Sequence, residues 1–216
     1  MKRVFGWVEI VFDILYLIIA IMIGFFLVIT SKDNSLRLLS GLMAFILVGG
    51  DIFHLIPRIR VILSKEEIRF RRALGTGKLI TSITMTVFYV MLWYLALILY
   101  NINNSLILTI CVYSLAITRI FLCLLPHNKW HDRYPPIRWG IYRNIPFFIL
   151  GLVVSYMFYL NSSKIPSFNL MYLAILLSFG FYLPVVLFAN RNPKIGMLML
   201  PKTSVYIWML WMFLSL

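Results

Sequence analysis

The chain has 216 residues, of which 62% are hydrophobic and only 12% are charged. A soluble domain averages roughly 45–50% apolar and about 25% charged residues, so the composition excludes a soluble domain and places the chain in a membrane. The net charge of +13 would point to nucleic acid in a soluble protein. Here Lys and Arg lie in short connections between apolar runs, so we expect anionic lipids and no nucleic acid as partners.

Seven apolar runs are long enough to cross a bilayer, which takes about 20 helical residues. The runs are continuous instead of alternating, and lipid accepts only helices or closed barrels, so they predict helices. We therefore expect an all-α, multi-pass helix bundle that forms one transmembrane domain. Its predicted spans cover residues of about 6–30, 37–57, 78–100, 105–125, 143–160, 168–189 and 195–215.

The positions of the 20 Lys and Arg residues predict the orientation of the spans. Fifteen of them lie before the first span or in the second, fourth and sixth connections, whereas three lie on the opposite side. Positive charge is retained in the cytoplasm, so we expect the N-terminus inside and, with seven spans, the C-terminus outside. The plasma membrane is the expected location.

The second connection, residues 58–78, predicts a basic amphipathic helix at about 64–75 on the cytoplasmic interface. Ser64 followed three residues later by Glu67 is typical of a capping box, and Gly75 and Gly77 are typical of a helix end. The apolar side chains of this segment could enter the interface while its arginines meet head groups. The alternative is a solvated basic loop that serves only topology.

Four ionisable residues fall inside the predicted spans: Asp13, Asp51, Arg119 and Lys202. Counted at about 1.5 Å per residue from the cytoplasmic end of each span, each lies roughly 9–11 Å deep. Intramembrane charges usually face the bundle interior and are functional candidates. Two acids and two bases at one depth could form a shared pocket, or a network that only holds four helices in register.

The second span adds a polar stripe to this layer. Asp51, His54 and Arg58 are spaced three and four residues apart, so they share one helix face. We expect catalytic roles for Asp51, His54 and Lys202, with His54 as a general base that Asp51 orients. Lys202, desolvated by the bundle, could act as base or nucleophile.

Further polar residues on the same side are candidates for substrate binding. Arginines can hold a phosphate or a carboxylate through forked hydrogen bonds. A substrate at head-group depth could also be contacted by amide and hydroxyl groups near the span ends. The expected substrate-binding residues are Asp13, Arg58, Arg119, Arg143, Asn144 and Tyr206.

The fourth connection holds a pair of histidines. His127 and His131 are four residues apart, a spacing used for metal ligation, and they lie on the same side of the membrane as His54. Three nitrogen ligands with an open position would suit a catalytic zinc. The alternative is an aromatic belt in which both histidines lie beside Trp130 and Trp139. We expect no obligatory cofactor, with zinc as the one metal to test.

The depth of the polar residues in the bilayer helps to decide between transport and the binding of an amphiphile. A transporter should place its site near the bilayer midplane between repeats, whereas the polar layer here is displaced toward one surface. An enzyme or receptor for an amphiphile needs polar groups at head-group depth and an apolar slot for the chain. We therefore expect the protein to bind or modify an amphiphilic or lipid-like substrate. The alternatives are a small-solute or ion transporter that uses the same charged cluster, and charges that are purely structural.

Overall fold

The computed structural model of the chain describes residues 2–103, 106–189 and 192–216, and these residues form an all-α bundle. Short 3-10 helices at 126–128, 166–168 and 193–198 lie in the connections between the long helices. The long helices are α1 (Lys2–Ile29), α2 (Ser35–Ser64), α3 (Glu67–Leu99), α4 (Leu106–Leu124), α5 (Ile137–Leu160), α6 (Met171–Phe188) and α7 (Met199–Phe213).

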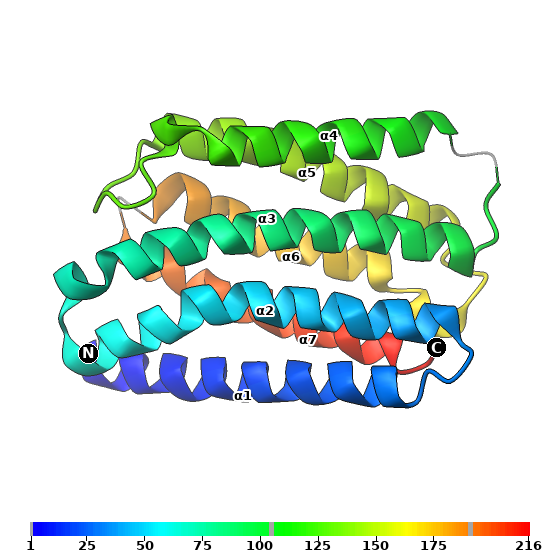
Figure 1. Cartoon of the computed structure of the whole chain (residues 1–216), viewed down its shortest axis with the longest axis horizontal. Coiled ribbons are helices and arrows are strands. Elements are labelled where there is room, and N and C mark those ends of the chain that lie inside the picture. The colour runs from blue at the N-terminus through cyan, green and yellow to red at the C-terminus, as the bar shows by residue number, and fades with distance from the viewer. Residues whose placement is uncertain (1, 104–105, 190–191) are drawn as a thin grey trace.

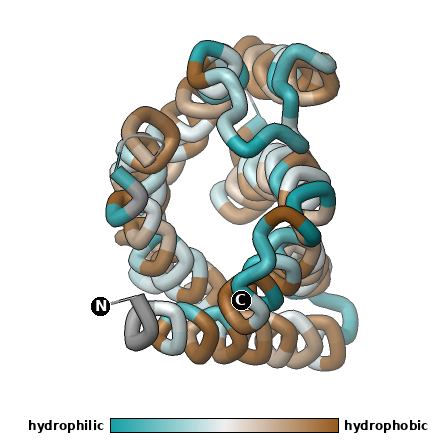
Figure 2. The backbone as a smooth tube through the Cα atoms, turned by 90° about the vertical axis from the view of Figure 1, so that its left-hand side faces the viewer, coloured by the Kyte–Doolittle hydropathy of each residue, from teal (hydrophilic) through white to brown (hydrophobic). Residues whose placement is uncertain are grey.

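The helices run alternately up and down the bundle and close into a ring. Each helix packs on the next one in the chain, and α7 returns to pack on α1. Figure 1 shows the helices side by side, with the two marked termini at opposite ends of the bundle. Figure 2 shows the ring end-on. The helix α3 also contacts α5 across the ring, so it is the most central element.

The prediction of membrane-spanning helices is confirmed in its main feature. Within the described residues, seven helices are long and apolar enough to cross a membrane. Predicted and observed helix ends agree within about three residues at the end of the bundle that carries the C-terminus. At the other end α2 and α3 continue past the apolar run. At about 1.5 Å per residue, their 30 and 33 residues exceed a hydrocarbon core of about 30 Å.

The basic segment after the second span differs from the expected interface helix. Residues 67–75 are the first part of α3, which runs without a break to Leu99. The hydroxyl of Ser64 donates to the carbonyl of Arg60 and accepts from the backbone N–H of Glu66. It therefore does not form the predicted capping box with Glu67. Hydropathy marks only the part of a helix that lies in lipid, so it cannot show where the helix itself begins.

The expected helix end at Gly75 and Gly77 is also wrong, because both glycines are buried inside α3. A side-chain carbon on Gly77 would collide with the backbone of Phe53 and His54 in α2, and one on Gly75 would collide with the carbonyl of Trp130. These glycines therefore allow close contact between backbones, as small residues do between membrane helices. They bring α2 and the connection after α4 against α3.

The middle of the bundle is filled by aromatic side chains. Trp93, Phe88 and Tyr89 of α3 are fully buried. The Tyr89 ring lies 5.2 Å from the Phe147 ring of α5 and 5.5 Å from the Phe179 ring of α6. Because such edge contacts add to the stabilisation from buried apolar area, the interior of the ring is a packed core.

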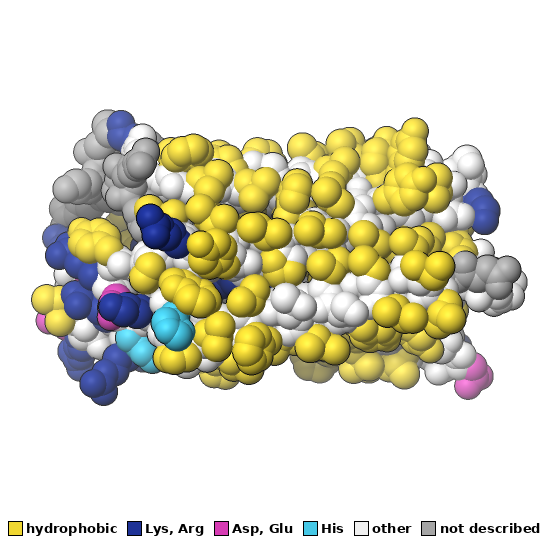
Figure 3. All heavy atoms as spheres, turned by 90° about the horizontal axis from the view of Figure 1, so that it is seen from above, with side chains coloured by type: hydrophobic (Ala, Val, Ile, Leu, Met, Phe, Trp, Pro, Cys, Tyr) yellow, Lys and Arg dark blue, Asp and Glu magenta, His cyan; other side chains and the backbone are white. Residues whose placement is uncertain are grey.

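Positive charge gathers at one end of the bundle. Figure 3 shows most of the visible Lys and Arg side chains, and the His side chains, at the end opposite the C-terminus, while apolar side chains cover the middle. This end holds the α2–α3 and α4–α5 connections and the start of α7. We refer to it as the basic end.

The glycine contacts predict a difference between two substitutions in the same helix pair. We expect Gly77→Ala to lower the free energy of unfolding by about 1–3 kcal/mol, because its methyl group overpacks a backbone contact. Gly49→Ala in α2 is the matched control, since no atom lies within 4 Å of its added carbon. The control should be neutral or stabilising by up to about 1 kcal/mol through helix propensity. Thermal unfolding followed by tryptophan fluorescence measures both, and equal effects would contradict the close contact.

Candidate functional site

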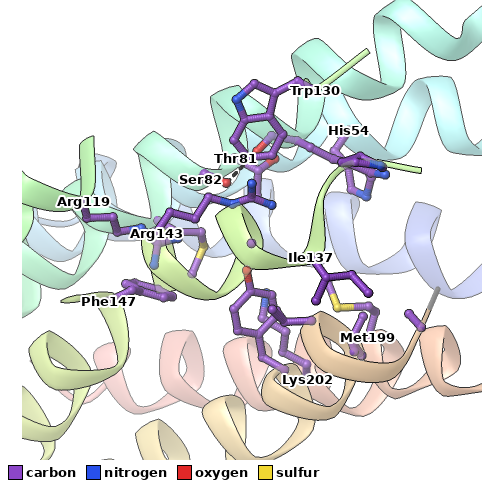
Figure 4. A pocket seen from close by; sticks show the side chains of 18 of the residues that line it. His54, Thr81, Ser82, Arg119, Trp130, Ile137, Arg143, Phe147, Met199 and Lys202 are labelled. Carbon is purple, nitrogen blue, oxygen red and sulfur yellow. Dashed lines mark hydrogen bonds between the residues drawn. The ribbon is translucent and has the colours of Figure 1, made fainter. Parts of the chain in front are cut away.

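A cavity of about 270 Å³ lies within the basic end of the bundle. Every long helix except α1 contributes to its wall, and the connection between α4 and α5 covers it. Figure 4 shows side chains from several helices pointing toward the cavity. The lining residues are His54, Lys78, Thr81, Ser82, Met85, Arg119, Trp130, Pro135, Pro136, Ile137, Gly140, Arg143, Phe147, Tyr182, Val185, Val186, Ala189, Met199 and Lys202.

The charges around the cavity are all of one sign. Lys78, Arg119, Arg143 and Lys202 reach it from α3, α4, α5 and α7. The chain contains seven acidic residues, and none of them is among the described residues that line the cavity. A cleft lined by one sign of charge between low-dielectric walls concentrates the potential. Asp51 and Glu67 lie outside this lining but are close enough to Lys202 and Lys78, respectively, to interact electrostatically. The lining itself is positive and favours an anion.

Arg119 is the most buried of these cations, with an exposed fraction of 2%. Its guanidinium carbon lies 3.3 Å from the centre of the Phe147 ring, a cation–π contact. The Nε and Nη1 atoms are buried and have no hydrogen-bond partner among the described residues. An arginine has five N–H donors, and leaving buried donors unpaired costs free energy. These two N–H groups could therefore donate to an acceptor in the cavity.

Lys202 reaches the cavity from the first turns of α7 and is also buried. Its Nζ lies 4.8 Å from the Tyr182 ring and 5.3 Å from the Tyr206 ring. Within the described part of the chain, no carboxylate oxygen lies within ion-pairing distance of this ammonium group. The two rings stabilise the cation while leaving its N–H donors available.

Asn144 and Tyr206 support the cavity without lining it. The amide of Asn144 donates to the carbonyl of Gly140 over 2.7 Å and accepts from the hydroxyl of Tyr182 over 3.0 Å. Tyr182 is thereby held under Lys202. The Tyr206 ring lies beside Lys202. Direct binding of substrate by Asn144 and Tyr206 stays a prediction.

Arg143 is fixed by the connection that covers the cavity. Its Nη1 donates to the Asn128 side chain over 2.7 Å, and its guanidinium carbon lies 4.0 Å from the Trp130 ring centre. Trp130 donates to the carbonyl of Cys123 at the end of α4 over 2.9 Å. The connection and the arginine therefore hold each other in place.

The wall formed by α2 and α3 is polar. Thr81 donates to the carbonyl of Gly50 over 3.0 Å, and Ser82 donates to the carbonyl of Lys78 over 2.8 Å. Both hydroxyl oxygens can still accept hydrogen bonds. The Nδ1 atom of His54 is buried without a partner among the described residues. His54 lines the cavity, and its role as a general base stays a prediction.

The acids of the predicted charged layer have separate surroundings. Asp51 accepts a 2.6 Å hydrogen bond from Tyr16 of α1, and Arg58 forms a 2.6 Å ion pair with Glu9 of α1. Asp13 is buried with an exposed fraction of 4%. None of Asp13, Asp51 and Arg58 lines the cavity. The four charges therefore do not share one pocket, because only Arg119 and Lys202 line the cavity, although Asp51 is close enough to Lys202 to interact electrostatically.

The three histidines predicted as zinc ligands do not lie together in the described part of the chain. His127 stacks on Trp139 with ring centres 4.9 Å apart, and His131 shares a 3.2 Å hydrogen bond with Thr76. His54 lies in the cavity, apart from both. No three His, Cys, Asp or Glu side chains come together as a metal site in residues 2–103, 106–189 and 192–216. The histidine spacing reflects contacts at the basic end instead.

The sequence prediction missed the polar wall of α3. Lys78 was counted with the connection before the third span, although Lys78, Thr81, Ser82 and Met85 follow the spacing of one helical face. That spacing is a signal that could have found them. Trp130 carried no such signal, because its place over the cavity depends on the contact of its connection with Gly75.

No family model, no curated protein and no solved structure matches this chain in comparisons with known proteins. Its function must therefore be inferred from the chemistry of the cavity.

Two arginines of the same cavity should respond oppositely to an apolar substitution. We expect Arg119→Met to raise the free energy of unfolding of the lipid-depleted protein by about 1 kcal/mol or more, because an unpaired buried charge is removed. Arg143→Met should lower it by a similar amount, because that arginine has partners in Asn128 and Trp130. Thermal unfolding measures both. If Arg119→Met lowers the free energy of unfolding as much as Arg143→Met does, the charge of Arg119 is purely structural.

Proposed function

We propose that this protein binds the anionic head group of an amphiphile in the cavity at the basic end, as an enzyme or receptor for a lipid-like substrate. The observation that carries the proposal is the wall of four cations without an acid, in which Arg119 is buried with unpaired donors. Ionisable side chains within membrane spans usually mark a substrate or ion site. Here the missing partner is an anion.

The chemistry of the wall selects the sign of the ligand's charge. Burying an isolated charge is costly unless it is paired, and in this cavity four cations come from four different helices. An anion would pair with all of them at once. A cationic or neutral solute would leave them unpaired, which argues against the transport of cations through this cavity.

The size and position of the cavity favour an amphiphile over a small solute. Its volume of about 270 Å³ is near the lower limit of ligand pockets, roughly 300 Å³, so it fits a head group and not a long chain. Arg119 lies five residues before the end of α4, about 8 Å along the helix. Val185, Val186 and Met199 provide an apolar wall. A chain can continue from there into the hydrocarbon layer.

The cavity also holds two side chains that could take part in a reaction. His54 and Lys202 reach it from opposite sides, and each is a type of residue that exchanges protons in enzymes. They support a role in modifying the bound head group. Asp51, which accepts from Tyr16, would then act at a distance from the substrate.

We further propose that the basic end faces the cytoplasm of the plasma membrane, in agreement with retention of positive charge on that side. Anionic lipids of the inner leaflet would then be adjacent to the exposed arginines and to the cavity.

Binding of matched single-chain probes tests the proposed function. In phosphatidylcholine nanodiscs, we expect hexadecyl phosphate to raise the unfolding temperature, whereas hexadecanol and hexadecyltrimethylammonium do not. Arg119→Gln and Lys202→Gln should each weaken binding by roughly 10–100-fold, as expected for a lost hydrogen bond to a charged group. Arg60→Gln is the control, since Arg60 is basic, exposed and outside the cavity. An equal loss of affinity for hexadecyl phosphate in Arg60→Gln, or equal binding of the three probes, would overturn the proposal.

The proposed orientation predicts which connections a membrane-impermeant thiol reagent can reach. In a background with Cys111 and Cys123 replaced, Ser163→Cys should be labelled from outside intact host cells. Lys129→Cys should be labelled only after the cells are opened. Both positions are exposed, so accessibility reports sidedness. The reverse pattern would place the basic end outside.

A further inference from the structure

We infer that the head group bound in the cavity is a phosphate carried on an apolar chain, as a phosphomonoester or a diphosphate, and not a carboxylate. The inference rests on the proposed function and specifies its substrate class. It follows from the number of charges around the cavity, from the directions in which their donors approach, and from the apolar wall.

The number of cations exceeds what a single negative charge can compensate. Lys78, Arg119, Arg143 and Lys202 surround the cavity, and Arg143 is close enough to Arg119 and Lys78 to interact with both electrostatically. Asp51 and Glu67 interact electrostatically with Lys202 and Lys78 from outside the lining. Four cations less these two acids leave two positive charges, of which a carboxylate would compensate only one. A phosphomonoester carries about −1.5 to −2 at neutral pH, and a diphosphate carries more. The cavity is therefore matched to a multiply charged head.

The donors also approach from several directions. Arg119 comes from α4, Arg143 from α5 and Lys202 from α7, and Figure 4 shows the two arginines near each other and Lys202 on another side. The oxygens of a carboxylate lie in one plane, whereas a phosphate presents three acceptor oxygens around a tetrahedral centre. Arg119 retains two buried N–H groups for such an acceptor. A tetrahedral head can engage all three cations together.

The wall on the α6 and α7 side distinguishes a lipid phosphate from free phosphate. Val185, Val186 and Ala189 line the cavity at the end of α6, and Met199 lines it at the start of α7. Inorganic phosphate has no apolar part that could cover this surface. An alkyl or isoprenoid chain attached to the phosphate would cover it, and this favours the phosphate of an amphiphile.

Three probes with the same hexadecyl chain separate charge from shape: hexadecyl phosphate, hexadecanesulfonate and hexadecanoate. The sulfonate is tetrahedral but carries one charge, so it isolates the effect of the second charge. The protein is placed in phosphatidylcholine nanodiscs, and the binding of each probe is measured at pH 7.5. Inorganic phosphate is the fourth probe. We expect hexadecyl phosphate to bind at least 10-fold more tightly than either monoanion and 100-fold more tightly than inorganic phosphate.

The dependence on pH gives a second readout. Because the second pKa of a phosphomonoester is about 6, raising the pH from 5 to 7.5 should tighten the binding of hexadecyl phosphate relative to the sulfonate. Titration of His54 or of any cation in the wall would change the binding of both probes, whereas the second ionisation changes only hexadecyl phosphate. The ratio of the two affinities therefore follows the charge of the ligand. Arg119→Gln and Lys202→Gln should reduce this ratio, and Arg60→Gln should not.

The outcomes separate the two proposals. Equal binding of phosphate, sulfonate and carboxylate would overturn the phosphate inference and leave anionic amphiphile binding standing. If inorganic phosphate binds as tightly as hexadecyl phosphate, the claim that the ligand carries an apolar chain is wrong. If none of the chain-bearing anions binds, both the phosphate inference and the proposed function fall.

Discussion

The structure is governed by the cost of placing an unpaired charge inside a bilayer, several kcal/mol per ion after relaxation. Four cations from four different helices converge on one cavity at the basic end, without an acid among its described lining residues. Aromatic rings cover Arg119, Arg143 and Lys202 on one side. Rings lower the cost of a buried cation by about 2 kcal/mol but do not neutralise it. This remaining cost is the physical basis for the proposal that the cavity binds an anion.

The acids near these cations do not line the cavity, although Asp51 is close enough to Lys202, and Glu67 to Lys78, to interact electrostatically. Glu9 pairs with Arg58, and Asp51 accepts from Tyr16, so α1 and the neighbouring face of α2 form a separate polar cluster. Close contacts at Gly75 and Gly77 hold α2 and the covering connection against α3. The lining of the cavity is therefore basic, while Glu9 and Asp51 have partners on α1 and α2, and this arrangement is the basis of the proposed anionic ligand.

The sequence predicted the spans well, because about 20 continuous apolar residues are a direct consequence of bilayer thickness. It also singled out Arg119 and Lys202, since a charge at membrane depth is conspicuous in an apolar run, and it named Arg143 and His54 as polar residues on the same side. All four line the cavity. It could not show which spans are neighbours, and so it grouped Asp13 and Asp51 with the cations at equal depth. The roles of Gly75 and Lys78 depend on the extension of α3 beyond the lipid, which hydropathy does not record.

The most direct measurement is an electron cryo-microscopy map of the protein in nanodiscs with hexadecyl phosphate added. We expect head-group density within hydrogen-bonding distance of both Arg119 and Lys202, with the chain leaving along the end of α6. A map in which the amphiphile lies elsewhere, or in which Asp51 has moved to pair directly with Lys202 while the cavity has closed, would contradict an anion-binding cavity.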